Sequence, residues 1–206
     1  TLNGKSYQVG GMEGQKERAY FKKGWEETLQ AGKEDFRFVR YQIQDMKPFI
    51  AWTRKTWAMN HQQATGKQID FEYASPLPEL KNILVTVHYQ ILDGMPLIIK
   101  WLSIENKSAG AIQIDRVVHE ILGLVEEESA VVGKPEEMKK QHGIYVETNY
   151  AFNNAMRYDI SDHTTHWKTE PAYTSQVNYN YETPCLLEIY PEKAPSIALK
   201  TGESFH

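Results

Sequence analysis

Cysteine is almost absent from this chain of 206 residues, in which Cys185 is the only one. No disulfide can therefore form within the chain. Cytoplasmic proteins rarely carry structural disulfides, but a bacterial periplasmic or surface protein can also lack them. The compartment thus stays unknown from the sequence, and we favour a periplasmic or extracellular location over a cytoplasmic one.

Long hydrophobic runs and clusters of basic residues are also missing. No stretch approaches the roughly 18 consecutive apolar residues that predict a membrane-spanning helix. The net charge is -4 and the lysines and arginines form no long cluster, so nucleic acid is not an expected partner. With 41% hydrophobic and 24% charged residues, the composition is that of an ordinary globular protein.

Sequence signatures of several enzyme classes are lacking as well. The chain has no glycine-rich phosphate loop and no Gly-x-Ser-x-Gly elbow. Asp162, His163 and His166 lie close together in the segment DHTTH, and two histidines at this spacing on a helix can share a metal ion. The segment reads as a loop, however, and no third ligand has a recognised spacing. We therefore predict a polar loop here, with neither a metal nor a cofactor.

Catalytic residues cannot be assigned from the sequence and stay unknown. Glycosidases need two carboxylates across a cleft, and the 27 acidic residues show no distinctive motif for such a pair. His88 and His119 lie in strand-like runs, where a histidine beside a carboxylate would transfer protons. His88 has no carboxylate on its own strand face, and Glu120 points away from the face of His119. We interpret both histidines as structural.

The sequence does contain a succession of short strand patterns. Residues 36–43 alternate with Phe38 and Tyr41 expected on opposite faces, and QIDFEYA at 68–74 alternates cleanly. The segment VTVHYQILDGMPLIIKWLSIEN at 85–106 reads as a hairpin around the turn Asp93-Gly94. Residues 112–125 fit a helical stripe or strands, and their β-branched residues favour strands. Further alternating or apolar runs occupy 144–150, 177–182, 185–190 and 203–205.

Many short strands separated by Gly, Pro, Asn and Asp turns predict an all-β fold, a large antiparallel two-sheet sandwich. We expect residues 1–206 to form a single domain. Because residues 203–205 read as the beginning of another strand, we expect this domain to be a fragment of a longer multidomain chain.

Aromatic residues are abundant, with 12 Tyr and 5 Trp. Sugar sites combine flat rings with hydrogen-bonding groups, although β-sheet cores use the same rings. The segment WKTEPAYTSQVNYNYETP at 167–184 mixes rings and amides most densely, and alternation assigns part of its aromatic set to the core. The candidate ligand-binding residues are Trp167, Tyr173, Asn178, Asn180 and Tyr181.

The hairpin, followed by WKTEPAYTSQVNYNYETPCLLEIYP, resembles the amino-terminal β-domain of bacterial α-galactosidase-like glycoside hydrolases. The resemblance covers most of the chain from about Gly10 onward, and its hairpin motif is moderately specific. The matching positions are His88-Tyr89, Asp93-Gly94, Pro96-Leu97, Lys100-Trp101-Leu102 and Asn106.

This resemblance implies the supersandwich fold called galactose mutarotase-like, and a (β/α)8 catalytic barrel in the same polypeptide as a partner. The family's catalytic aspartates lie on that barrel, so none is carried over to this chain. The hypothesis is an ancillary domain of a glycoside hydrolase that supports the barrel and contacts carbohydrate, without catalysis by itself. The alternatives are a free-standing aldose mutarotase or epimerase and a pure carbohydrate-binding module. In each case we expect the hairpin to be core scaffold, with Trp101 buried.

Overall fold

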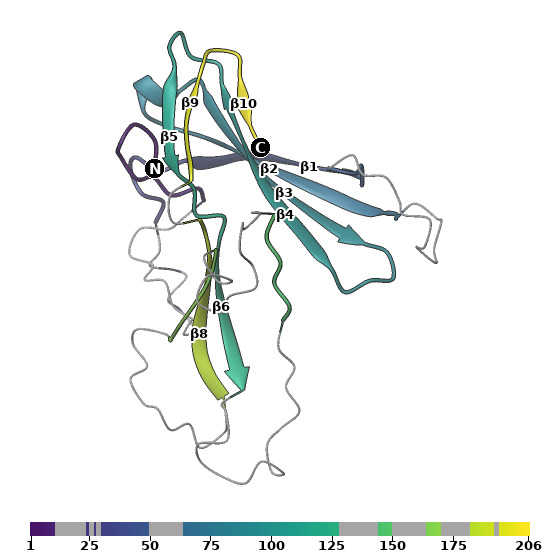
Figure 1. Cartoon of the computed structure of the whole chain (residues 1–206). Coiled ribbons are helices and arrows are strands. Elements are labelled where there is room, and N and C mark those ends of the chain that lie inside the picture. The colour runs from purple at the N-terminus through teal and green to yellow at the C-terminus, as the bar shows by residue number, and fades with distance from the viewer. Residues whose placement is uncertain are drawn as a thin grey trace, which may run out of the picture. The chain divides into compact units, whose positions relative to one another are not determined.

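The structure, a computed structural model, describes residues 1–10, 24, 27, 30–49, 64–127, 144–149, 164–169, 182–191 and 194–206 (Figure 1). This described part contains ten β-strands and the short 3-10 helix η2 (Pro78–Leu80). The strands are β1 (Arg37–Asp45), β2 (Gly66–Ala74), β3 (Ile83–Leu92), β4 (Ile98–Asn106), β5 (Ile112–Arg116), β6 (Glu120–Glu127), β7 (Thr165–Thr169), β8 (Glu182–Ile189), β9 (Pro195–Leu199) and β10 (Ser204–Phe205). The fold is all-β with antiparallel sheets, as predicted, and is consistent with a sandwich.

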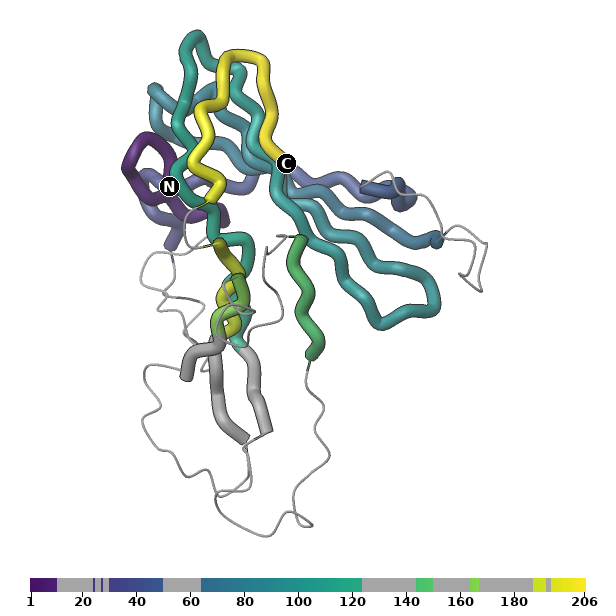
Figure 2. The backbone as a smooth tube through the Cα atoms, viewed as in Figure 1, coloured from purple at the N-terminus to yellow at the C-terminus, as the bar shows by residue number. Residues whose placement is uncertain are grey.

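The chain divides into two compact units. The first comprises Thr1–Ser6, Met12–Ala31 and Gln113–Ala198, and the second comprises Tyr7–Gly11, Gly32–Ile112 and Leu199–His206. Segments far apart in the sequence therefore meet within the second unit. Figure 2 shows the yellow C-terminal segment beside the teal central strands, in agreement with the pairing of β10 with β4.

The second unit is built on a five-stranded sheet in the order β1-β2-β3-β4-β10. In β2 the alternation of QIDFEYA places Ile69, Phe71 and Tyr73 on one face and the polar residues between them on the other. Phe71 lies opposite Val87 of β3, and Val87 lies opposite Leu102 of β4. The register thus aligns the apolar positions of three strands into one apolar face, and the polar positions into a polar face.

The predicted hairpin is confirmed as β3 and β4, which pair from Ile83 opposite Asn106 to Ile91 opposite Ile98. Its turn contains Gly94 in the left-handed region, at a φ of 72°. At the other end, the side chain of Asn106 is fully buried and donates hydrogen bonds of 2.8 Å to the carbonyl oxygens of Gly110 and Leu199. This side chain therefore fastens the end of β4 to the segment that leads into β10.

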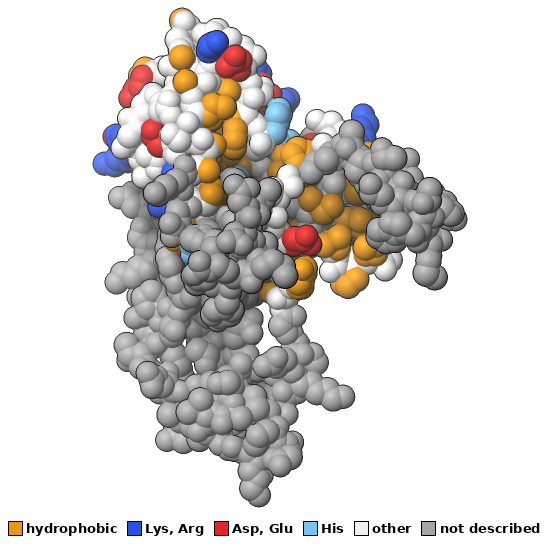
Figure 3. Space-filling model, in the orientation of Figure 1, with side chains coloured by type: hydrophobic (Ala, Val, Ile, Leu, Met, Phe, Trp, Pro, Cys, Tyr) orange, Lys and Arg blue, Asp and Glu red, His pale blue; other side chains and the backbone are white. Residues whose placement is uncertain are grey.

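The apolar face is covered at one end of the strands and open at the other. Ile83 and Ile104 are buried, whereas Ile91 and Ile98, on the same face near the hairpin turn, are 57% and 66% exposed. Figure 3 shows hydrophobic side chains gathered over the sheet. The hydrophobic stabilisation of the sheet is therefore concentrated at the buried end of the face.

A β-bulge in β1 corrects one detail of the sequence analysis. Phe38 and Tyr41 were expected on opposite faces, but both lie on the apolar face, opposite Tyr73 and Phe71 of β2. The register shifts between Phe38 and Arg40, so Val39 is an additional residue in the strand. A bulge restores alternation after one extra residue, and the sequence pattern alone does not reveal it.

The first unit contains a three-stranded antiparallel sheet in the order β6-β8-β7 and the pair β5-β9. Residues 112–125 form strands, as predicted, within β5 and β6. Leu2 bridges to Ile114, and both side chains are buried. Leu187 of β8 is also buried, opposite Leu122 of β6. Leu2, Ile114 and Leu187 therefore form part of the apolar interior of this unit.

Two further predictions have different outcomes. The prediction of a strand at 144–150 is wrong for the described residues 144–149, which lie in no strand. A strand needs a neighbouring strand to pair with, and alternation in the sequence does not supply one. The predicted strand at 177–182 lies outside the described residues except for Glu182, which begins β8. Across the described ranges, no helix is both long and apolar enough to cross a membrane.

Candidate functional site on the polar sheet face

Three polar side chains from three adjacent strands meet on the polar face of the five-stranded sheet. Asp70 of β2 lies directly opposite His88 of β3. Ser103 of β4 lies opposite Thr86, two residues from His88 along β3 and therefore on the same face. His206 follows directly after β10, whose Phe205 pairs with Ile104. Strand alternation and register thus bring together residues from four separate segments of the sequence.

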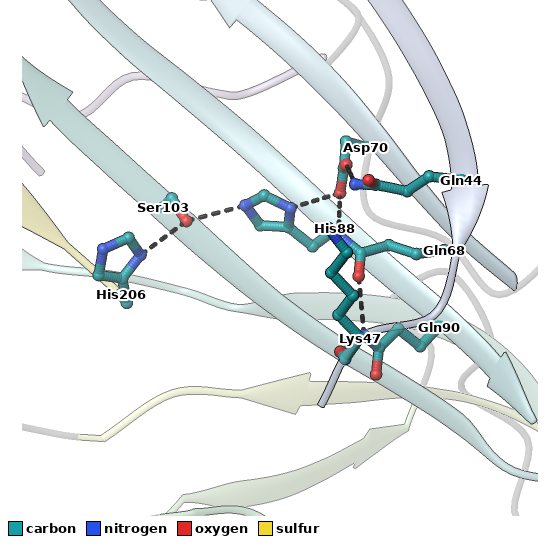
Figure 4. Close-up of polar contacts among 8 residues, drawn as sticks. All are labelled: Gln44, Lys47, Gln68, Asp70, His88, Gln90, Ser103 and His206. Carbon is teal, nitrogen blue, oxygen red and sulfur yellow. Dashed lines mark hydrogen bonds and ion pairs between the residues drawn. The ribbon is translucent and has the colours of Figure 1, made fainter. Parts of the chain in front are cut away.

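These four side chains form a continuous row of hydrogen bonds (Figure 4). Nδ1 of His88 is 2.5 Å from Oδ1 of Asp70, and Nε2 of His88 is 2.8 Å from Oγ of Ser103. Oγ of Ser103 is in turn 3.0 Å from Nδ1 of His206. We refer to Asp70, His88, Ser103 and His206 as the polar row.

The inner three members of the polar row are shielded from solvent and the outer member is exposed. The side chains of Asp70 and His88 are 13% and 15% exposed, Ser103 is 7% exposed, and His206 is exposed. Polar groups shielded from water are stable only when they are hydrogen-bonded, which the three inner members are. The polar row therefore links a half-buried carboxylate to an imidazole at the surface.

Two glutamine amides hold the carboxylate of Asp70 in place. Nε2 of Gln68 donates to Oδ1 of Asp70, and Nε2 of Gln44 donates to Oδ2, each at 2.8 Å. Burial acts to raise the pKa of Asp70, but the hydrogen bonds from His88, Gln68 and Gln44 and the attraction of His88 together lower the pKa below its usual value. Asp70 is accordingly a carboxylate at neutral pH.

The amide of Gln90 fixes the position of Gln68. Nε2 of the buried Gln90 donates to Oε1 of Gln68 at 2.8 Å and to the carbonyl oxygen of Lys47 at 2.7 Å. The orientation of the Gln68 amide is therefore determined, since its oxygen accepts from Gln90 and its nitrogen donates to Asp70. The same contact ties the segment after β1 to the polar face.

Stacked aromatic rings border the polar row. The ring of His88 lies 4.6 Å from that of Trp101 with an angle of 11° between their planes, and Phe49 lies 4.4 Å from Trp101 at 21°. Trp101 is half-buried and belongs to the polar face, so the expectation that it would be buried in the scaffold is wrong. Trp101 lies directly opposite His88 in the sheet, and its indole therefore stacks on the imidazole and fixes the orientation of the imidazole ring.

The chemistry of the four groups gives the hydrogen bonds a direction. An ionised carboxylate only accepts, so Nδ1 of His88 carries a proton and donates to Asp70. In a neutral His88, Nε2 then accepts the hydroxyl proton of Ser103. The oxygen of Ser103 is left as an acceptor for Nδ1–H of His206. All four groups are thus satisfied when both histidines are neutral.

The order Asp, His, Ser is also that of a nucleophilic triad, but the strand position of Ser103 favours proton transfer over acyl transfer. A nucleophilic serine needs nearby donors that stabilise the oxyanion formed on the substrate. Ser103 lies within β4, which pairs with β3 along its length and with β10 at Ile104 and Glu105. Where β4 pairs with β3 and with β10, its backbone N–H groups are used in the sheet and do not converge on a substrate oxygen.

The residues predicted from the sequence to bind a ligand lie elsewhere in the chain. Trp167 lies on β7 opposite Leu187, in the first unit. Tyr173, Asn178, Asn180 and Tyr181 fall outside the described residues. The structure therefore leaves these five assignments as predictions.

The other histidine candidates have local roles in the first unit. His166 stacks on Tyr190 with ring centroids 4.0 Å apart, and its Nε2 is 3.1 Å from the carbonyl oxygen of Tyr190. The backbone of His119 donates to the carbonyl oxygen of Ile189. Asp162 and His163 lie outside the described residues. In the described part of the chain, no three His, Cys, Asp or Glu side chains are grouped as a metal site would require.

The sequence analysis missed the polar row because it looked for a carboxylate on the same strand as His88. The partner comes from the neighbouring strand, and its identity depends on the register between β2 and β3. No family model matches the chain, and no curated protein has a matching sequence.

Proposed function

We propose that this chain is an ancillary β-sandwich domain of a carbohydrate-active enzyme, and that the polar face of its five-stranded sheet binds carbohydrate. The proposal is supported by the antiparallel β-architecture and by the likeness of the hairpin to the amino-terminal domain of α-galactosidase-like glycoside hydrolases. A (β/α)8 barrel in the same polypeptide would then supply the catalytic groups, and the galactose mutarotase-like fold is part of this proposal.

The observation that carries the proposal is the combination of chemistries on the polar face. Toward the β1 edge, Arg40 and Gln42 are exposed, and Glu72 receives two hydrogen bonds from the Arg40 guanidinium at 2.8 and 2.7 Å. Farther in, Gln44 and Asp70 continue the same face, and the exposed ring of Phe49 lies over Trp101. Sugar hydroxyls are recognised by such amides and charged groups, and sugar C–H groups by aromatic rings.

A second candidate function is interconversion of sugar anomers by proton transfer. It is favoured by one observation, the half-buried pair of Asp70 and His88 on a single sheet face. Such an enzyme needs an acid and a base on either side of the anomeric carbon. Here both ring nitrogens of His88 are engaged by Asp70 and Ser103, so His88 offers no nitrogen to a sugar directly, and binding is the better supported function.

Saturation-transfer NMR of the chain with galactosides, glucosides and uronic acids tests the binding proposal. Transfer from one sugar should be lost in Gln42→Ala and kept in Tyr41→Ala, because these neighbours on β1 face opposite sides of the sheet. Loss only in Trp167→Ala or Tyr181→Ala would move the site to the segment predicted from the sequence. Absence of transfer from every sugar would contradict carbohydrate binding by this chain.

A colorimetric assay separates the ancillary role from catalysis. The chain should release no nitrophenol from a nitrophenyl α-galactoside, because the proposal assigns the catalytic carboxylates to another part of the polypeptide. Turnover that survives purification and is lost in Asp70→Asn would refute the ancillary role.

A further inference from the structure

We propose that the polar row is a proton relay, and that it makes the exposed imidazole of His206 a general base for a hydroxyl group. In this assignment His206 is the residue that contacts the hydroxyl-bearing molecule. Asp70, His88 and Ser103 act through it as positioning and charge-storing groups. The inference does not depend on carbohydrate binding, since any alcohol or a water molecule could donate the proton.

The relay starts from the state in which Asp70 is ionised and both histidines are neutral. In that state Asp70 accepts from Nδ1–H of His88, Nε2 of His88 accepts from Ser103, and Ser103 accepts from Nδ1–H of His206. With its proton on Nδ1, His206 has an unprotonated Nε2 at the outer end of the row. That nitrogen is the atom that receives a proton.

Proton uptake at His206 can be balanced along the row without any other reactant. A hydroxyl proton binds Nε2 of His206, and the Nδ1 proton of His206 moves to Oγ of Ser103. The original hydroxyl proton of Ser103 then moves to Nε2 of His88. His206 and Ser103 end neutral, His88 becomes an imidazolium, and the donor becomes an alkoxide or hydroxide.

The surroundings of His88 are suited to hold this positive charge. The carboxylate of Asp70 is 2.5 Å from Nδ1, and Gln44 and Gln68 keep that carboxylate oriented. The indole of Trp101 is stacked on the imidazole at 4.6 Å, where a cation is attracted by the ring face. The carboxylate and the indole thus place two groups that attract a positive charge in direct contact with the imidazole of His88.

In the described part of this face, two further pairs of charged groups are in contact. Arg40 of β1 binds Glu72 of β2, and Glu105 of β4 is 2.6 Å from the ammonium group of Lys107. Asp70 is thus the carboxylate that contacts His88 directly. A change of charge at His88 is expected to affect Asp70 and, through Ser103, His206.

Long-range ¹H–¹⁵N NMR of the whole chain at neutral pH tests the relay, because it reports which nitrogen of each imidazole carries the proton. His88 and His206 should both be Nδ1–H tautomers. Ser103→Ala removes the acceptor for Nδ1–H of His206, so His206 should then adopt mainly the Nε2–H form. Ser103→Thr keeps the hydroxyl and should restore the Nδ1–H tautomer.

Thr86→Val is the matched control, because Thr86 lies directly opposite Ser103 on the same face and outside the polar row. It should leave both tautomers unchanged. An Nε2–H tautomer of His206 in the wild type, or the same His206 tautomer with and without the Ser103 hydroxyl, would overturn the relay. If Ser103→Ala does not fold, Asp70→Asn serves instead: it removes the ionised acceptor of His88 Nδ1–H and should shift His206 toward the Nε2–H tautomer, and an unchanged tautomer would contradict the proposal.

Discussion

Asp70 and His88 lie directly opposite each other on neighbouring antiparallel strands, with 2.5 Å between the carboxylate oxygen and Nδ1 of the imidazole. No local sequence motif links the two residues, because the pairing depends on the register of β2 with β3. Because Trp101 is opposite His88 on the next strand, the same register also sets the plane of the imidazole.

Replacement of Asp70 by Asn should destabilise the fold and change its response to acid. Because the pKa of Asp70 is lower in the folded than in the unfolded chain, its stabilising effect is complete above the unfolded pKa of about 3.9 and is lost as pH falls through the folded pKa. At pH 7 the loss should be about 2 kcal/mol, as for a hydrogen bond to a charged group. Urea unfolding between pH 2 and 7 measures this loss. The free energies of unfolding of the wild type and the variant should converge at the acid end of the range. A constant difference across this range would contradict the assignment.

Asn106→Ala should be among the most destabilising single changes in the second unit. The amide donates to two carbonyl oxygens, and its own oxygen accepts from the backbone and hydroxyl of Ser108. Truncation removes the buried hydrogen bond to the carbonyl oxygen of Leu199 and the contact to Gly110, at a cost of about 3 kcal/mol. Ser108→Ala is the control and should cost less than about 1 kcal/mol, because Asn106 keeps both of its donor contacts. Chemical unfolding compares them, and equal costs would show that the Asn106 amide does not fasten this end of β4.

Gly94→Ala and Gly110→Ala isolate the effect of backbone strain, because neither position is crowded. An added Cβ meets no atom within 4 Å at either position, but only Gly94 of the two has a positive φ, at 72°. Alanine at Gly94 should therefore cost about 1 kcal/mol, whereas alanine at Gly110 should leave the stability nearly unchanged. Thermal unfolding of the two variants gives the comparison, and an equal loss in both would argue against the turn geometry.

The two ends of the apolar face should respond differently to truncation. Ile104 is buried and Ile98 is 66% exposed, although both lie on β4 and on the same face. Ile104→Ala should cost about 3 kcal/mol and Ile98→Ala less than about 1 kcal/mol. A large loss for Ile98→Ala in urea unfolding would mean that the open end of this face is covered in solution.

The sequence predicted much of the sheet, because alternation and turn chemistry are local. The 68–74 strand, the 85–106 hairpin and its Asp93-Gly94 turn all follow from neighbouring residues. The bulge at Val39 did not follow, because the pattern on either side of it alternates normally. The strand predicted at 144–150 failed for the complementary reason, since alternation was present in its described residues without a partner strand.

The polar row could not be predicted from one sequence because it depends on three registers. His88 was singled out, but Asp70 is 18 residues away and Ser103 is 15 residues away, on the neighbouring strands. His206 is 103 residues from Ser103 and arrives by the pairing of β10 with β4. The sequence feature that pointed to the site was the alternation of polar and apolar residues in β2 and β3. Asp70 and His88 each lie near the middle of the polar positions in this alternation.

The most direct test of carbohydrate binding by the polar face is a map of backbone amide shifts during titration of the ¹⁵N-labelled chain with the sugar that shows transfer. The account predicts that the largest changes fall on β1 and β2 at Gln42, Gln44 and Asp70, with smaller ones at Phe49. Changes confined to residues 167–184, or no changes at saturating sugar, would contradict it.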